Sequence, residues 1–596
     1  MQYCVSPFVF ARRLAREVVV GDLQRGGVII GGAHPVVHQS MLTCDTMDTA
    51  ECVRQTLELV AVGCQLVRIT APTVKDAANL QPIVAELRAR GCHVPIAADI
   101  HFKPEAALEA ARWVEKIRVN PGNYADKKKF ATRDYTDDDY AAELERLEEQ
   151  FSPLVKLCLQ LGRAMRIGAN HGSLSDRVLN RYGDTPMGMV ESALEFARIC
   201  RKLGYHNFLF SMKSSNPKIM IECYRLLVAK LAALGPDWNY PIHLGVTEAG
   251  EGEDGRIKSA IGIGSLLCDG LGDTIRVSLT EDSPYEIPVC RDLVAQVPRL
   301  TTATLAAGRG ATLPGAPFDP FKYQRRATRE VELAPRIKCG GEQTIRVVVT
   351  RPVFTAVSKG PAASNDLKPE AALDNLNLAE INPLQPFRIP PEAQLVTVQD
   401  GLRLPAIAAF RLLAGRLKEM GSDTPVLLKD CLENAPAAAP SHLAQLQSAV
   451  VLGALLADGF GDAILVRREA DPALALRLSY NILQAVGSRS FKTDYVACPS
   501  CGRTLFNLQT VTARIKSRTQ HLKGVKLAIM GCIVNGPGEM ADADFGYVGG
   551  APGKVNLYVG KTAVRFNIPE AEAVDLLVAL IKEHGKWVEP AEATLA

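Results

Sequence analysis

The chain has 596 residues, of which 47% are hydrophobic, and its formal net charge at neutral pH is only +3. This length predicts three to four domains, with larger barrels permitted, and the hydrophobic content is ample for several cores. A net charge this small gives no reason to expect nucleic acid as a partner. No apolar run approaches the ~20 residues of a membrane span, so no membrane association is expected. The short, mildly apolar start leaves no room for a long transit peptide, which predicts the cytoplasm.

Short β-rich runs alternate with amphipathic helical stretches from about residue 36 to residue 280. Apolar residues at three- and four-residue spacing mark the helices, for example at Thr49–Val62 and Pro217–Leu234. Eight such β-then-α units predict a TIM barrel, with a doubly wound open sheet as the alternative. The expected strands are Val36–Thr43, Leu66–Thr70, Pro95–Ile100, Lys116–Asn120, Met165–Asn170, Asn207–Ser214, Pro241–Glu248 and Asp273–Thr280.

The fourth connection, from Tyr124 to Leu161, is unusually long and highly charged. We interpret it as a solvated surface helix with a flexible lead-in, and a lid over the barrel mouth is the alternative.

The composition changes after Thr280, where proline-rich stretches resemble loops or linkers. One internal repeat is informative: Leu455–Val466 (LLADGFGDAILV) matches Leu266–Val277 (LLCDGLGDTIRV), with Leu465 in the place of Arg276. We infer a degenerate barrel-like duplication without a polar mouth, although two helix–glycine–strand junctions could match by chance. The expected domains are a catalytic barrel at 1–296, an inserted barrel-like scaffold at 297–487 and a small α/β domain at 488–596.

Three cysteines and one carboxylate form the most distinctive motif of the C-terminal segment. Cys498 and Cys501 are a C-x2-C pair, Cys532 follows in a glycine-rich stretch, and Glu539 stands seven positions later. Three thiolates and one exchangeable oxygen favour an iron–sulfur cluster with a labile fourth ligand. A zinc ribbon is the alternative, but it normally needs a second cysteine or histidine pair. Disulfides are less expected, because 15 cysteines are scattered over the chain without a dense framework.

Charged and polar residues cluster at the carboxyl ends of the expected barrel strands, where TIM barrels place their chemistry. Arginine presents a planar fork suited to phosphate, so several cations at one mouth predict a small substrate with two phosphates. Salt-bridged structural arginines are the alternative. Asp99 and Glu248 could orient substrate hydroxyls or relay a proton. The full set is Arg68, Asp99, His101, Arg118, Asn120, Arg166, Asn170, Lys213, Ser214, Ser215, His243, Thr247, Glu248 and Arg276.

Several of these motifs, in this order, resemble the 4-hydroxy-3-methylbut-2-en-1-yl diphosphate synthase family of the methylerythritol phosphate route to isoprenoids. The resemblance covers the barrel and the C-terminal segment, and the added middle segment is similar to the three-domain form of plants and some bacteria. The matching motifs are VRIT (67–70), ADIHF (98–102), IRVNPGN (117–123), RIGANHGSL (166–174), HLGVTEAG (243–250), ACPSCGR (497–503) and GCIVNGPGE (531–539).

The resemblance implies a [4Fe-4S] cluster held by Cys498, Cys501, Cys532 and Glu539, with Glu248 and Glu539 as catalytic residues. It implies two-electron reductive opening and dehydration of 2-C-methyl-D-erythritol 2,4-cyclodiphosphate to (E)-4-hydroxy-3-methylbut-2-enyl diphosphate. The electron donor would be a ferredoxin or a flavodoxin, and His171 would join the residues that bind the substrate. The insert would let the cluster domain close over the barrel of its own chain, in a monomer or a dimer. A zinc-stabilised TIM-barrel lyase or transferase for a small phosphorylated substrate is the alternative function.

Overall fold

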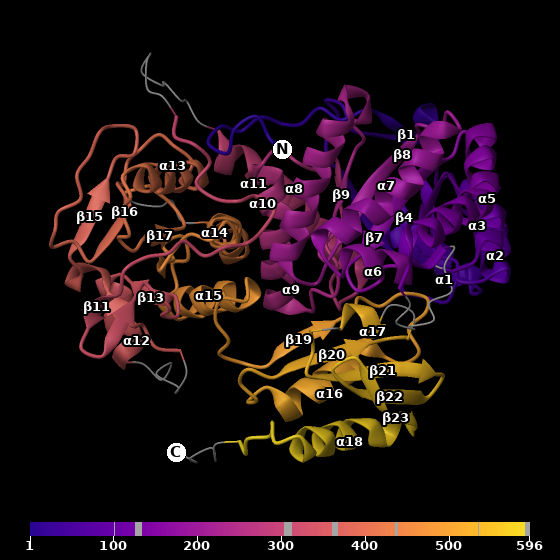
Figure 1. Ribbon diagram of the computed structural model, residues 1–596. Coiled ribbons are helices and arrows are strands. Elements are labelled where there is room, and N and C mark those ends of the chain that lie inside the picture. The colour runs from indigo at the N-terminus through magenta and orange to yellow at the C-terminus, as the bar shows by residue number, and fades with distance from the viewer. Residues whose placement is uncertain are drawn as a thin grey trace.

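The computed structural model describes residues 1–100, 102–124, 134–302, 313–359, 367–434, 439–533, 536–540 and 542–590, so His101 lies outside it. Figure 1 shows a barrel in indigo to magenta, a middle part in red to orange, and a C-terminal part in yellow set against the barrel. The domain limits 1–296, 297–487 and 488–596 stay a prediction, and the first limit falls inside α11 (Glu286–Thr301). Within the described ranges, every helix is too short or too polar to span a bilayer.

The expected TIM barrel is confirmed. Its eight strands run in the order β8-β7-β6-β5-β4-β3-β10-β9, and a parallel bridge between Phe210 and Ile242 joins the two ends. All neighbouring strands are parallel, so their carboxyl ends meet at one mouth. The strands are β3 (Val37–Met41), β4 (Leu66–Thr70), β5 (Ile96–Asp99), β6 (Lys116–Val119), β7 (Ala164–Asn170), β8 (Phe208–Lys213), β9 (His243–Leu244) and β10 (Thr274–Ile275).

Helices surround this barrel, and one of them forms most of the long fourth connection. Helix α5 (Asp137–Leu161) buries Leu147, Phe151 and Leu154 and packs against its neighbours α3 and α7. The surface-helix interpretation therefore holds for α5, while residues 125–133 lie outside the described ranges. The other helices of the wall are α1 (Thr49–Ala61), α2 (Val74–Ala89), α3 (Pro104–Ala111), α7 (Pro186–Lys202), α8 (Pro217–Leu234), α9 (Gly252–Ser259), the π-helical turn η3 (Ala260–Gly264) and α10 (Ser265–Cys268).

A small antiparallel hairpin of β1 (Val18–Val20) and β2 (Val28–Ile30) covers the amino end of the barrel. Val18, Val20 and Ile30 pack onto the first residues of the barrel strands, such as Leu66 and Ala164. The sequence pattern did not predict this hairpin.

The middle part repeats the barrel with two strands fewer among its described residues. Its parallel strands follow the order β14-β13-β18-β17, and the bridge between Val396 and Val426 adds β16 and β15. This order matches β4-β3-β10-β9-β8-β7 of the barrel. The strands are β13 (Arg346–Val349), β14 (Ala371–Ala372), β15 (Leu378–Ile381), β16 (Leu395–Val398), β17 (Leu427–Lys429) and β18 (Ala463–Leu465), and the helices include α13 (Ala406–Glu419), α14 (Ser441–Ala457) and α15 (Pro472–Ala485).

Equivalent local contacts support the duplication. The Arg13 N–H donates to the Gly270 carbonyl at 2.9 Å, and the Arg326 N–H donates to the Gly459 carbonyl at the same distance. A second antiparallel hairpin, β11 (Val331–Ala334) with β12 (Ile337–Cys339), corresponds to β1 and β2. The repeat found in the sequence is therefore part of a longer structural repeat.

The two barrels pack through a reciprocal interface. A Cβ atom added to Gly264 would lie 2.3 Å from Val450, and one added to Gly453 would lie 2.4 Å from Ile261, so these backbones approach closely. Beside them Arg225 and Arg411 each bind both Asp269 and Asp458, with all four ion pairs at 2.8 Å and all four side chains buried. Each aspartate belongs to one copy of the repeat.

The mouth of the middle barrel corrects one expectation, because it is polar. Lys429 and Arg467, at the ends of β17 and β18, bind the two oxygens of Asp400 at 2.6 and 2.7 Å. Asp430 accepts from the Ser448 hydroxyl at 2.7 Å. The repeat has Leu465 in the place of Arg276, which predicted an apolar mouth. Instead, Lys429, Arg467 and Asp400 make the mouth polar with charges that neutralise one another.

The C-terminal part is a five-stranded mixed sheet in the order β19-β20-β21-β22-β23 with helices on it. Strand β21 was not expected from the sequence, since its glycines weaken the strand pattern. The elements are β19 (Asp494–Ala497), α16 (Leu508–Thr519), β20 (Lys526–Met530), α17 (Gly536–Glu539), β21 (Phe545–Ala551), β22 (Lys554–Val559), β23 (Thr562–Pro569) and α18 (Glu570–Glu583). The short helix α17 faces the barrel (Figure 1).

Candidate active site

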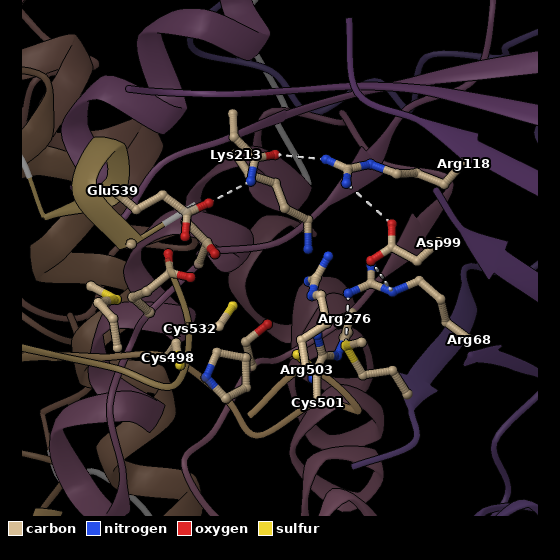
Figure 2. A pocket seen from close by; sticks show the side chains of 18 of the residues that line it. Arg68, Asp99, Arg118, Lys213, Arg276, Cys498, Cys501, Arg503, Cys532 and Glu539 are labelled. Carbon is tan, nitrogen blue, oxygen red and sulfur yellow. Dashed lines mark hydrogen bonds and ion pairs between the residues drawn. The ribbon is translucent and has the colours of Figure 1, made fainter. Parts of the chain in front are cut away.

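A cavity lies where the barrel mouth meets the C-terminal part. It contains about 650 Å³ of space not filled by protein atoms, part of it open to solvent. Figure 2 shows the barrel cations on one side and the cysteines and Glu539 on the other. The wall is formed by Met41, Arg68, Asp99, Arg118, Arg166, Asn170, Lys213, Thr247, Glu248, Arg276, Ser278, Cys498, Pro499, Cys501, Arg503, Met530, Cys532, Gly536 and Glu539.

Asp99 holds two of the arginines in place. The Arg118 guanidinium lies 3.1 Å from one Asp99 oxygen, and Arg68 lies 3.7 Å from the other. Arg118 also donates to the Gly168 carbonyl at 3.0 Å. Asp99 is buried at the end of β5, between Arg68 of β4 and Arg118 of β6 (Figure 2). Its contacts therefore orient these two cations.

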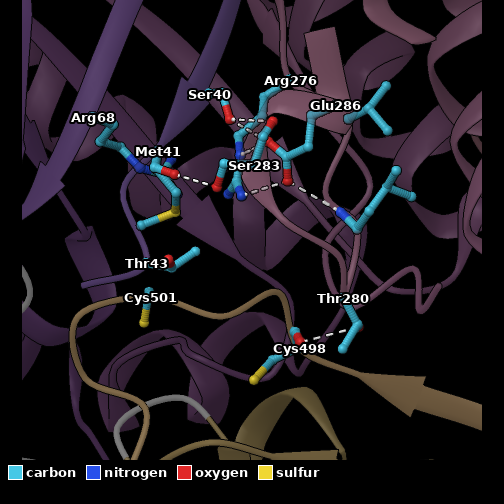
Figure 3. Close-up of polar contacts among 12 residues, drawn as sticks. Ser40, Met41, Thr43, Arg68, Arg276, Thr280, Ser283, Glu286, Cys498 and Cys501 are labelled. Atoms are coloured by element: carbon cyan, nitrogen blue, oxygen red, sulfur yellow. Dashed lines mark hydrogen bonds and ion pairs between the residues drawn. The ribbon is translucent and has the colours of Figure 1, made fainter. Parts of the chain in front are cut away.

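Arg276 is held by Glu286, which the sequence pattern did not predict as part of the site. Glu286, at the start of α11, accepts from the Arg276 guanidinium at 3.0 and 2.8 Å and from the Ser40 hydroxyl at 2.6 Å (Figure 3). Glu286 is 1% exposed, so this bidentate pair is shielded from water. Ten positions separate the two residues, and no local spacing signals that one orients the other.

The cavity has more cations than carboxylates. Six of its lining side chains are lysine or arginine, and three are acidic. Burial lowers the pKa of Lys213 well below its usual range, and the neighbouring Arg68 and Arg166 lower it further. Burial also lowers the pKa of Arg68 to about 10, although Asp99 opposes the shift. A bound polyanion would stabilise the charged forms of cations held this close together. This property is expected of a diphosphate site.

The three cysteines of the C-terminal part line the same cavity. The Gly531 N–H donates to Cys498 Sγ at 3.2 Å, and the Arg503 side chain hydrogen bonds to Cys501. Donors of this kind stabilise thiolates that ligate iron–sulfur clusters. No three His, Cys, Asp or Glu side chains of the described residues converge closely enough to hold one ion. Three thiols and one carboxylate that line one cavity are nevertheless a donor set of the kind that would hold an iron–sulfur cluster.

Asn170 connects the cationic side of the cavity to Glu539. Its Nδ2 donates to Glu539 Oε1 at 2.6 Å, and its Oδ1 accepts from Arg118 at 3.1 Å. Glu248 lies beside Glu539, and burial together with this neighbouring carboxylate raises the pKa of Glu248. Glu248 also has a φ of 49°, a left-handed conformation that is uncommon outside glycine.

The C-terminal part docks onto the mouth through backbone contacts. Gly172 (φ 76°) lies so close to Gly538 that a Cβ atom on Gly172 would be 2.1 Å from the Gly538 carbonyl oxygen. The Thr280 hydroxyl donates to the Cys498 carbonyl at 3.2 Å (Figure 3), and Ala249 forms a parallel bridge with Ala497. The cluster motif and the barrel mouth of one chain therefore form one site.

Four residues expected at the substrate site do not line the cavity. Asn120 is buried and accepts from the Gly122 N–H at 3.2 Å, and His171 lies 3.6 Å from Asp184. His243 is buried, and burial lowers its pKa well below the usual range. Ser215 is half-buried in the loop after β8. The other expected residues, apart from His101 and the buried Ser214, line the wall together with Met41, Ser278, Pro499, Arg503, Met530 and Gly536, which were not expected there.

Comparison with known proteins agrees with this geometry. The family described as GcpE TIM-barrel domain matches residues 16–291, and the GcpE protein C-terminal domain matches residues 494–583. The chain belongs to the GcpE family. The family expected from the sequence motifs is thereby confirmed, and its two matches cover the barrel and the part that carries the cysteines.

Relatives of the GcpE chain are similar over nearly its whole length. A protein of Akkermansia muciniphila named 4-hydroxy-3-methylbut-2-en-1-yl diphosphate synthase (flavodoxin) is 55% identical, covering 99% of each chain. The chloroplastic enzyme of Oryza sativa subsp. japonica, named as the ferredoxin form, is 43% identical, covering 99% of this chain and 89% of its own. Dihydropteroate synthase of Burkholderia cenocepacia matches with a TM-score of 0.31 at 14% identity, covering 47% of this chain and 95% of its own, a likeness too weak to carry an argument.

Proposed function

We propose that this chain converts 2-C-methyl-D-erythritol 2,4-cyclodiphosphate to (E)-4-hydroxy-3-methylbut-2-enyl diphosphate. The reaction consumes two electrons and two protons, opens the ring and releases one water. The observation that carries the proposal is that six cations and the Cys498, Cys501, Cys532 and Glu539 set line one cavity. The relatives' names support the same reaction and give no support to a zinc-stabilised lyase or transferase.

A [4Fe-4S] cluster would be held by Cys498, Cys501, Cys532 and Glu539. When bound, such a cluster supplies electrons and Lewis acidity. Glu539 is the one oxygen donor of the set and the exchangeable ligand. Asn170 would hold the Glu539 carboxylate in place, since it already donates to Oε1 at 2.6 Å.

The barrel residues would bind and orient the diphosphate. Arg68 and Arg118, held by Asp99, and Arg276, held by Glu286, present fixed guanidinium groups to the cavity. Arg166 and Lys213 line the wall between them. Cations fixed in this way position the reacting carbon and need not reorganise during the reaction. Glu248 and Thr247 would hold substrate hydroxyls, and docking of the C-terminal part would exclude water.

Anaerobic reconstitution with iron and sulfide provides the test. The holoenzyme is expected to show an iron–sulfur absorption band and to form the hydroxybutenyl diphosphate from the cyclodiphosphate, with a chemical reductant or with reduced flavodoxin or ferredoxin. Product would be identified by mass spectrometry. A colourless protein that binds one zinc per chain and leaves the cyclodiphosphate intact would refute the proposal.

A further inference from the structure

Two cysteines outside the cavity wall form a close pair on the barrel mouth. Cys44 lies in the loop between β3 and α1, and Cys52 lies in the first turns of α1. Their Sγ atoms are 3.5 Å apart. Closing this distance by roughly 1.5 Å would give a disulfide, which is within the reach of side-chain rotation in a loop.

The two thiols differ in exposure and in protonation. Cys44 is partly exposed, whereas Cys52 is fully buried. The Cys52 sulfur also lies 3.4 Å from the Asp45 carbonyl oxygen. The hydrogen bond from Cys52 lowers the pKa of Cys44, and the same contact together with burial raises the pKa of Cys52. A partly exposed thiol of lowered pKa beside a buried thiol is the arrangement of a reactive and a resolving cysteine.

The loop that carries Cys44 also supports the cluster motif. A Cβ atom added to Gly502 would lie 2.5 Å from the Cys44 carbonyl oxygen and 2.7 Å from the Thr70 hydroxyl, so Gly502 packs tightly on this loop. Gly502 directly follows Cys501. The rest of the loop is anchored, because Asn79 donates to the Thr46 carbonyl at 2.7 Å. A displacement of Cys44 would therefore shift the turn that carries Cys501.

We propose that Cys44 and Cys52 are a peroxide-reactive dithiol that forms a disulfide beside the cluster motif. Cys44 loses its proton, and the thiolate attacks the terminal oxygen of a hydroperoxide. The O–O bond breaks, Cys44 becomes a sulfenic acid, and the departing hydroxide or alkoxide takes up one proton and leaves as water or an alcohol. The Cys52 sulfur then attacks Cys44, the S–S bond forms, and the hydroxyl of the sulfenic acid leaves as water with the Cys52 proton. Overall, two thiols lose two electrons and two protons, and the hydroperoxide accepts them.

The test uses the intact reconstituted chain under anaerobic conditions. It is treated with one equivalent of hydrogen peroxide, denatured in acid with N-ethylmaleimide and digested with trypsin. Cys44 and Cys52 fall in one tryptic peptide, residues 26–54. We expect this peptide to lack the alkylating group and to be lighter by two hydrogen atoms than its reduced form, and a dithiol reductant should reverse the change.

Two variants separate the roles of the thiols. In Cys52→Ser, the disulfide should be absent and dimedone should trap the sulfenic acid at Cys44. Cys64→Ser is the matched control, because Cys64 is buried in the same barrel and its thiol donates to the Leu66 carbonyl at 3.3 Å. It should oxidise like the wild type. Hydrogen exchange around Gly502 should increase on oxidation of the wild type and of Cys64→Ser, but not on oxidation of Cys52→Ser.

The proposal is overturned if both cysteines of the wild-type peptide remain alkylated after peroxide treatment. It is also overturned if Cys44 in Cys52→Ser is oxidised no faster than the buried Cys64. Neither readout requires turnover, so the proposed function and the dithiol can fail independently.

Discussion

Replacing Asn170 tests the connection between the phosphate cations and Glu539. Asn170→Ala removes a 2.6 Å hydrogen bond to the Glu539 carboxylate and a 3.1 Å bond from Arg118. A hydrogen bond to a charged group contributes about 1.5–3 kcal/mol, which corresponds to roughly a 10- to 150-fold loss of kcat/KM. Asn170→Asp should lose more, because it keeps the shape but places a second carboxylate against Glu539.

The assay is formation of the hydroxybutenyl diphosphate by reconstituted enzyme with a chemical reductant, alongside iron content and the visible spectrum. Asn207→Ala is the control, since Asn207 bonds to the Val19 backbone at the opposite end of the same barrel. It should keep wild-type kcat/KM. Wild-type kcat/KM in Asn170→Ala with full iron content would refute the reasoning, because Glu539 would then need no partner on the barrel.

Further substitutions probe the cluster ligand, the phosphate site and the interface between the barrels. Glu539→Ala should change the spectrum of the reduced cluster and abolish turnover, and an unchanged electron paramagnetic resonance spectrum would count against ligation. Arg118→Ala should raise KM and lower kcat, because a misplaced diphosphate misplaces the reacting carbon; unchanged steady-state kinetics would remove it from the site. Arg411→Met should lower the free energy of unfolding by about 3–5 kcal/mol, since it leaves buried aspartates underpaired. In urea titrations, Arg416→Met on the same helix should cost under about 1 kcal/mol, and equal losses would contradict the buried network.

Much of the fold follows from local pattern. The barrel strands could be predicted because each is a short apolar run between amphipathic helices, and their parallel order places Arg68, Arg118 and Arg276 at one mouth. The hairpin of β1 and β2 was missed because two three-residue strands give little periodicity. Strand β21 was missed because its sequence, FGYVGGA, contains three glycines.

The site residues could be predicted only where their type and their spacing along the chain form a recognisable motif. The cysteines and Glu539 form a motif along the chain, so their common location could be expected. Glu286 could not be found in this way, because it reaches Arg276 from a following helix. Asn120 and His243 stay predictions as substrate-site residues, because both are buried near strand ends and lie outside the cavity wall.

The neutralised mouth of the middle barrel has a consequence for where metabolites bind. An anion entering there would first have to separate Lys429 and Arg467 from Asp400. Asp99 and Glu286 also pair with arginines at the first mouth, but six cations line that cavity against three carboxylates, so a surplus of positive charge is left for an anion. Two related scaffolds in one polypeptide thus need not compete for the same ligand. Ion pairing within one copy would favour binding of an anion at the other.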